Sequence, residues 1–350
     1  MKSISIFSNH NDAGVGSIIE TVCRAESAGL VIRAGRSDKS SFIQSGGRHV
    51  RLTQLSAGIV TGANMVISGG VVNPLTLAME IDKLAALGLS DVPSRLFVEA
   101  STAVSTPYHT AIARLEILCG LPVKDWMGDS LALASNAPCI DALDVLIGGR
   151  KLRSKVDEIF EWGMNRSESL NSPSMPFDVM APFARDVGEV VDEIQKLSSI
   201  SKIITGYDRL LGGGCPVIHE GHRLCDEVIR VIPVYTTERS RFGKPTEIDA
   251  LDTDNDNRNS LTEKQWLGDV RAGLVALGST NKLAASSLAI TKCDKLKNSS
   301  DWSYIDTRGD QPHPINKVDS SKFIGHMADL EKLPVKIESH GKTYQHKVLK

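Results

Sequence analysis

The stretch that most constrains the fold is a polar turn with two glycines near the N-terminus, Asn9 to Ser17. Before it, Ser3 to Phe7 alternate polar and apolar side chains as a short strand does, and after it the apolar residues from Ile18 to Val22 have helical spacing. Such turns are where α/β sheets commonly bind phosphate, because backbone N–H groups and the positive end of the helix dipole face the loop. The sequence therefore predicts a phosphate site here, with an ordinary strand-to-helix turn as the alternative.

Individual residues of this turn suit phosphate chemistry. Gly14 and Gly16 would let the backbone approach an anion, with Ser17 where the helix starts. The carboxylate of Asp12 could hold Mg²⁺ or take a proton, and His10 beside it is a candidate acid or base. The turn differs from the Walker pattern Gly-x4-Gly-Lys-Ser/Thr, because no lysine follows the second glycine.

Strand-like and helix-like segments alternate along much of the chain. This alternation predicts an α/β fold with a doubly wound, mostly parallel central sheet and flanking helices, similar to that of P-loop NTPases. We expect a hairpin over 42–52, strands at 30–36, 64–68, 95–100, 216–221, 228–235, 287–294 and from 333, and helices at 75–87, 107–118, 151–162 and 184–197.

We expect residues 1–350 to form a single α/β domain. Within it, residues 120–215 are predicted to be a mainly helical insertion. Residues 249–262 are rich in Asp and Asn and are predicted to be an exposed, mobile acidic loop.

Composition excludes several classes of protein. The net charge of −2, with basic and acidic residues interspersed, argues against a nucleic-acid partner. The six cysteines form no CxxC pair, which favours free thiols in a reducing compartment. No apolar run is long enough to span a membrane, so a cytoplasmic location without a membrane partner is expected, in the host cytoplasm if the chain is phage-encoded.

Several segments, in chain order, resemble adenylosuccinate synthetase, most closely its shorter archaeal and phage-type forms. They are Val71-Val-Asn-Pro-Leu75 with the helix after it, Tyr108-His109 opening another helix, Glu220-Gly221 after a strand, Tyr235 to Glu247, and Thr291-Lys-Cys-Asp294.

The resemblance implies a purine-nucleotide ligase that joins L-aspartate to C6 of a purine nucleotide monophosphate. A nucleoside triphosphate, GTP or else ATP or dATP, would phosphorylate the 6-oxygen with Mg²⁺ present, and aspartate would displace that phosphate. The purine nucleotide would be IMP, or (d)GMP in a phage-type version. The family also implies a homodimer.

The family's functional residues carry over to this sequence by position. Asp12 matches the aspartate that takes the purine N1 proton and binds Mg²⁺, and Asp294 matches the carboxylate that accepts the N1 and N2 hydrogens of guanine. The other matches are Gly14, Gly16 and Ser17 in the phosphate loop, Lys292 on the base face, and Thr246 and Glu247 in the loop on the aspartate or metal side.

Departures fall on groups that handle charge. Val15 replaces the phosphate-loop lysine, and Ser41 stands in place of the family's catalytic histidine. The other altered substrate positions are Ser130 in a remnant of the nucleotide-phosphate loop, Arg223 in place of a glutamine, Lys264 as the remaining cation of the aspartate-binding run, and Arg150 as a candidate dimer-interface contact.

These losses leave alternatives open. The second interpretation is a catalytically degenerate nucleotide-binding or regulatory relative. A third is an ATP-dependent ligase of altered specificity, in which His10 or Arg223 assumes a lost role. Retention of Asp12 discriminates among them, because an inert relative does not need a carboxylate beside the phosphate site.

Overall fold

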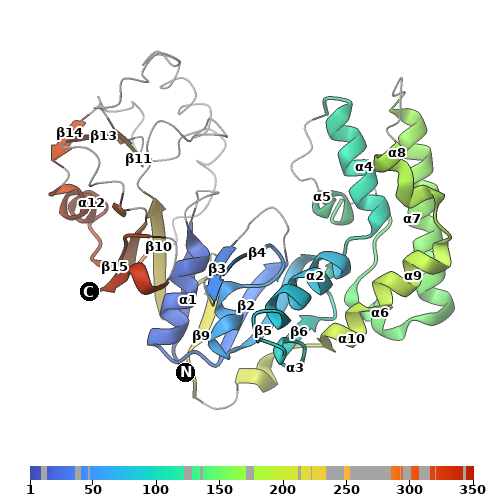
Figure 1. Cartoon of the computed structure of the whole chain (residues 1–350), viewed down its shortest axis with the longest axis horizontal. Coiled ribbons are helices and arrows are strands. Elements are labelled where there is room, and N and C mark those ends of the chain that lie inside the picture. The colour runs from blue at the N-terminus through green and yellow to red at the C-terminus, as the bar shows by residue number, and fades with distance from the viewer. Residues whose placement is uncertain are drawn as a thin grey trace. The chain divides into compact units, whose positions relative to one another are not determined.

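The computed structural model describes residues 1–8, 14–35, 41–45, 48–121, 128–134, 137–170, 177–211, 214–221, 223–233, 248–252, 285–291, 293–294, 301–306, 316–319, 321–341 and 344–350. The chain divides into two compact units (Figure 1). Unit 1 comprises residues 1–2 and 22–220, and unit 2 comprises residues 3–21 and 221–350. That residues 1–350 form a single domain stays a prediction.

Unit 1 contains a parallel sheet with the strand order β9-β2-β5-β6-β8. Its strands are β2 (Leu30–Gly35), β5 (Asn64–Val72), β6 (Leu96–Glu99), β8 (Lys202–Ile204) and β9 (Val217–Glu220), and the short β7 (Ala103–Val104) pairs with β5. The predicted hairpin is confirmed as β3 (Ser41–Ser45) and β4 (Arg48–Leu52).

Both faces of the unit 1 sheet are covered, as a doubly wound sheet requires. In β5, Met65 and Ile67 belong to the main apolar core, whereas Val66 between them belongs to a second cluster. The alternation follows from the period of a strand, in which successive side chains point to opposite faces. The second cluster packs against four apolar side chains, Ile204, Tyr207, Leu210 and Leu211. The last two lie in the 3-10 helix Asp208–Leu211.

Helices supply the rest of the main core. Asn73 caps helix α2 (Pro74–Ala85) by accepting a hydrogen bond from Thr76 N, as the Asn-Pro pair predicts. Helix α7 packs against both α4 and α9 (Figure 1). The remaining bounds are α3 (Val92–Arg95), α4 (Pro107–Leu118), α5 (Asp129–Ala132), α6 (Ala142–Ile147), α7 (Gly149–Ser169), α8 (Phe177–Met180), α9 (Val187–Gln195), α10 (Leu197–Ile200), and the 3-10 helices Ala57–Thr61 and Ala181–Ala184.

Unit 2 holds strands in the order β16-β15-β12-β10-β1, parallel except for β16. A separate antiparallel sheet has the order β11-β13-β14. The bounds are β1 (Ser3–Phe7), α1 (Val15–Ala25, continuing into unit 1), β10 (Glu227–Pro233), β11 (Ile248–Asp252), β12 (Ser287–Thr291), β13 (Asp301–Asp306), β14 (Asn316–Asp319), α12 (Phe323–Glu331), β15 (Val335–Ser339), the 3-10 helix Tyr344–His346 and β16 (Lys347–Leu349).

The fold class predicted from the sequence is confirmed, but one boundary is corrected. Residues 249–252 of the predicted acidic loop belong to β11, because their backbone pairs with the distant strand β13, and residues 253–262 lie outside the described residues. The insertion at 120–215 is mainly helical but also contains β8, which pairs with β6. Among the described residues, no helix is both long and apolar enough to cross a bilayer.

Candidate nucleotide-binding site

The glycine turn meets the end of a core strand in unit 2. Gly14 has a φ of +70°, a backbone conformation that side chains disfavour, and lies directly before α1. A Cβ built at Gly14 would lie 4.0 Å from Thr291, the last residue of β12. The structure thus brings Gly14, from the described part of the predicted phosphate turn, beside the last residue of the strand that precedes Asp294.

The first turn of α1 differs slightly from the sequence expectation. The helix begins at Val15, so Gly16 and the buried Ser17 lie within its first turn. The Ser17 hydroxyl donates to the carbonyl of Gly14 at 2.9 Å, which fixes the turn from inside the helix. The N–H groups at this helix end have no helical acceptor, and they favour an anion.

Two side chains after the end of β12 are described, the thiol of Cys293 and the carboxylate of Asp294. Cys293 is buried, which raises the pKa of its thiol to about 12, and its Sγ lies 3.3 Å from the carbonyl of Ile290. Asp294 follows and is partly exposed. Cys293 is therefore a neutral packing residue, whereas Asp294 is positioned at a strand end where a ligand could reach it.

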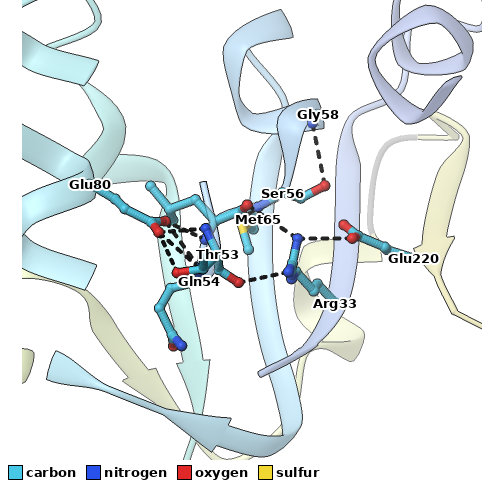
Figure 2. Close-up of polar contacts among 9 residues, drawn as sticks. Arg33, Thr53, Gln54, Ser56, Gly58, Met65, Glu80 and Glu220 are labelled. Carbon is cyan, nitrogen blue, oxygen red and sulfur yellow. Dashed lines mark hydrogen bonds and ion pairs between the residues drawn. The ribbon is translucent and has the colours of Figure 1, made fainter. Parts of the chain in front are cut away.

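A buried ion pair lies at the carboxyl ends of two neighbouring strands of unit 1 (Figure 2). Arg33 of β2 and Glu220 of β9 are paired in register, with Arg33 Nη1 2.8 Å from Glu220 Oε1. The guanidinium also donates to the carbonyls of Thr53 and Leu55, at 2.7 and 3.2 Å. Because a buried charge requires partners, this pair fixes both the strand ends and the 53–55 loop.

A second carboxylate holds the same loop through its amides. Glu80 of α2 accepts hydrogen bonds from the N–H groups of Thr53, Gln54 and Leu55 (Figure 2). The side chain of Gln54 in turn accepts from Asn73 N at 3.0 Å. Arg33 and Glu80 thus bind the carbonyls and the amides of one loop at the edge of the unit 1 sheet, where ligands of α/β folds usually bind.

The phosphate-loop remnant packs against the start of α4. A Cβ at Gly128, where φ is +79°, would lie 2.5 Å from the carbonyl oxygen of His109. Thr106 and His109 form a capping box, and burial lowers the pKa of His109 to about 4. Ser130 lies in α5, directly after this close contact. The neutral imidazole is therefore part of the helix cap.

The structure describes some of the remaining predicted site residues and not others. Arg150 lies exposed in the first turn of α7, and Arg223 is exposed with its backbone N–H bonded to Ser5 Oγ at 3.1 Å. Ser41, at the position of the family's histidine, is buried in β3. Asp12, His10, Lys292, Thr246, Glu247 and Lys264 lie outside the described residues.

Sequence reasoning missed Arg33 and Glu80. Each was signalled by a charge within an apolar pattern: Arg33 interrupts the strand run Leu-Val-Ile-Arg-Ala, and Glu80 lies between Leu77 and Ile81 on the buried side of α2. A charge at such a position is rarely buried without partners.

A family model and several curated proteins match parts of this chain. Residues 6–118 match the family model of adenylosuccinate synthetase. The chain is 28% identical over 274 residues to the adenylosuccinate synthetase of Neisseria gonorrhoeae, which covers 68% of this chain and 63% of the relative. It is 25% identical over 284 residues to that of Methanococcoides burtonii, covering 71% of this chain and 66% of the relative.

The fold has a solved counterpart. The structure of fully ligated adenylosuccinate synthetase from Plasmodium falciparum aligns with a TM-score of 0.71 and 13% identity, and covers 100% of both chains. In the sequence alignments, by contrast, the chain spans less than two thirds of the length of these curated relatives.

The sheets and their flanking helices define an α/β protein with a mostly parallel central sheet. Within that class, the chain is similar to the adenylosuccinate synthetases, from which it is divergent, and it matches their family model over residues 6–118.

Proposed function

We propose that this protein is a triphosphate-dependent ligase that joins L-aspartate to C6 of a purine nucleotide, IMP or a guanine nucleotide. The observation that carries the proposal is the placement of Gly14, at the start of α1, against Thr291 at the end of β12. That contact supports a phosphate-binding role for the turn and a base-reading role for the segment that leads to Asp294, both in the same unit.

The chemistry needs two steps. Asp12 removes the N1 proton of the purine, the 6-oxygen attacks the γ-phosphorus of the triphosphate, and the nucleoside diphosphate leaves. The amino group of aspartate then attacks C6, and inorganic phosphate leaves with the 6-oxygen. The N–H groups at the start of α1 bind phosphate oxygens, and Asp294 accepts the N1 and N2 hydrogens of a guanine base.

Mg²⁺ is the metal that this chemistry implies, and it would neutralise charge on the transferred phosphoryl group. Its candidate ligand, Asp12, offers the carboxylate oxygens that Mg²⁺ prefers. Within the described ranges, no group of three His, Cys, Asp or Glu side chains could hold a metal ion. The metal site at Asp12 is therefore a proposal that rests on the ligand type alone.

We propose that other residues of this chain take over the roles of the family's charged groups that are absent here. Arg223 is exposed beside the turn that follows β9, and its cation suits a phosphate or the aspartate carboxylates. His10 beside Asp12 is the corresponding candidate for the lost acid on the 6-oxygen.

We also propose a homodimer that includes the start of α7. Helix α6 directly before it exposes Leu146 and Ile147, at 54% and 57%, beside the exposed Arg150. Adjacent exposed apolar side chains are typical of an interaction surface. All six cysteines are free thiols, which fits the proposed cytoplasmic location.

The test is a mass-spectrometric product assay. Purified protein is incubated with Mg²⁺ and aspartate, with IMP, GMP or dGMP, and with GTP, ATP or dATP, alongside Asp12→Ala and the exposed-site control Asp178→Ala. A succinylated purine that forms with wild type and Asp178→Ala but not with Asp12→Ala supports the ligase. Absence of both product and triphosphate hydrolysis in every combination contradicts it and favours the non-catalytic relative.

A further inference from the structure

Helix α7 has two opposite faces of different character. The helix packs against α4 and α9, and its buried residues are Leu152, Val156, Ile159, Gly163 and Ser167. Two residues make a rotation of about 200° in an α-helix, so positions two residues earlier lie on the opposite face. Four of these positions are exposed and form one stripe along the helix: Arg150, Ser154, Asp157 and Glu161.

The charges of this exposed stripe are placed unfavourably for the helix alone. Arg150 lies in the first turn of α7, where the positive end of the helix dipole disfavours a cation. Asp157 and Glu161 are four residues apart, a spacing at which like charges repel. The ion pairs of α7 that the structure describes are made by other residues, Lys151, Lys155 and Arg166.

The exposed stripe is complementary to a reversed copy of itself. Its spacings of four, three and four residues read the same in both directions. Against an antiparallel second copy, Arg150 faces Glu161 and Ser154 faces Asp157, and a two-fold axis repeats both contacts. The cation then meets an anion, and the serine hydroxyl can donate to a carboxylate. A parallel copy in register would instead set like charges against each other.

Apolar surface adjoins the cationic end of the exposed stripe. Leu143, Leu146 and Ile147 of α6, which directly precedes α7, are 39%, 54% and 57% exposed. Exposed ion pairs alone contribute little to affinity, whereas they do fix the orientation and register of two partners. The apolar side chains of α6 can therefore supply area that is removed from water, and the stripe can set the geometry.

We propose that the exposed stripe of α7 is a two-fold contact between two copies of this chain, packed antiparallel, with Arg150 of each copy bound to Glu161 of the other. The inference rests on the homodimer of the proposed function and adds its surface, its symmetry and its register. Its consequence is that a carboxylate occupies the guanidinium of Arg150, which is then not available to a substrate phosphate.

The test exchanges the two charges and measures dimer dissociation by sedimentation equilibrium. Arg150→Glu and Glu161→Arg each place like charges opposite one another at both symmetry-related contacts. The double variant, and an equal mixture of the two single variants, restore opposite charges. Asp192→Arg on the exposed side of α9 is the matched control. Arg150→Glu should keep its fold, because the helix dipole favours an anion in the first turn, and thermal unfolding checks this.

Each single variant should raise the dissociation constant of the dimer about tenfold or more, and the control should leave it unchanged. The double variant and the mixture should regain the wild-type value. Dimers that the single changes do not weaken, or that the exchange does not restore, would overturn this surface and leave the homodimer in place. A monomeric wild type would contradict both. Product formation tests the ligase separately from these results.

Discussion

Arg33 and Glu220 face each other across the paired strands β2 and β9, with Nη1 and Oε1 2.8 Å apart. The side chain of Arg33 is 3% exposed and that of Glu220 is 13% exposed, so the pair is shielded from water. The same guanidinium binds the carbonyls of Thr53 and Leu55. The pair therefore links two strand ends and a loop at the edge where a ligand is expected.

Removal of one member of this pair should destabilise unit 1 strongly. Arg33→Leu leaves the carboxylate of Glu220 buried without its cation, a change that typically costs about 3–5 kcal/mol. The double variant Arg33→Leu/Glu220→Leu removes both charges and should be more stable than the single variant. Urea unfolding measures both, with the exposed Arg51→Leu as control. An equal loss of unfolding free energy in Arg33→Leu and Arg51→Leu would show that the ion pair does not contribute to stability.

The negative charge of Glu80 should contribute to the free energy of unfolding through the 53–55 loop. Glu80→Gln keeps the shape of the side chain but provides a weaker acceptor for the three amides of the 53–55 loop. We expect a loss of about 1–3 kcal/mol in the free energy of unfolding. Glu158→Gln on the exposed side of α7 is the control and should change it little. Hydrogen exchange should increase at residues 53–55 in Glu80→Gln, and unchanged exchange there would contradict the assignment.

Two adjacent glycines of β5 should respond very differently to alanine. Gly69 and Gly70 both have positive φ, at 70° and 66°. A Cβ at Gly69 meets no atom within 4 Å, whereas one at Gly70 would lie 2.2 Å from the carbonyl oxygen of Gly35. Gly69→Ala should cost about 1–2 kcal/mol from backbone strain alone, and Gly70→Ala considerably more. Thermal unfolding distinguishes the two, and similar melting temperatures would contradict the close approach of β2 and β5.

His109 should make stability depend on pH. Burial lowers its pKa to about 4, so below pH 6.5 the unfolded chain binds a proton more readily than the folded chain. The contribution of His109 is complete above pH 6.5 and is lost as the pH falls toward 4, by up to about 3 kcal/mol. The difference between wild type and His109→Gln, followed by urea unfolding across this range, should show that loss. A constant difference would contradict it.

Local signals in the sequence predicted much of the fold. The Asn73-Pro74 start of α2, the hairpin at 41–52 and helix α4 are confirmed, because each depends on caps, turns and periodicity within a few residues. The strand β8 was missed since it is short and pairs with β6, a partner distant in sequence.

The site was predictable only in part. The resemblance assigned Gly14 and the segment from Thr291 to Asp294 to one site, which stays a prediction, and a Cβ at Gly14 would lie 4.0 Å from Thr291. The Arg33–Glu220 pair depends on strand register, which no local pattern encodes.

The measurement that tests the central claim most directly follows the 6-oxygen of the purine nucleotide. The protein is incubated with aspartate, Mg²⁺, a triphosphate and IMP or GMP labelled with oxygen-18 at O6, and the released phosphate is analysed by mass spectrometry. A 6-phosphoryl intermediate predicts one labelled oxygen in each phosphate, together with the succinylated product. Released phosphate without the label, or phosphate formed equally well without aspartate and purine nucleotide, would contradict the ligase.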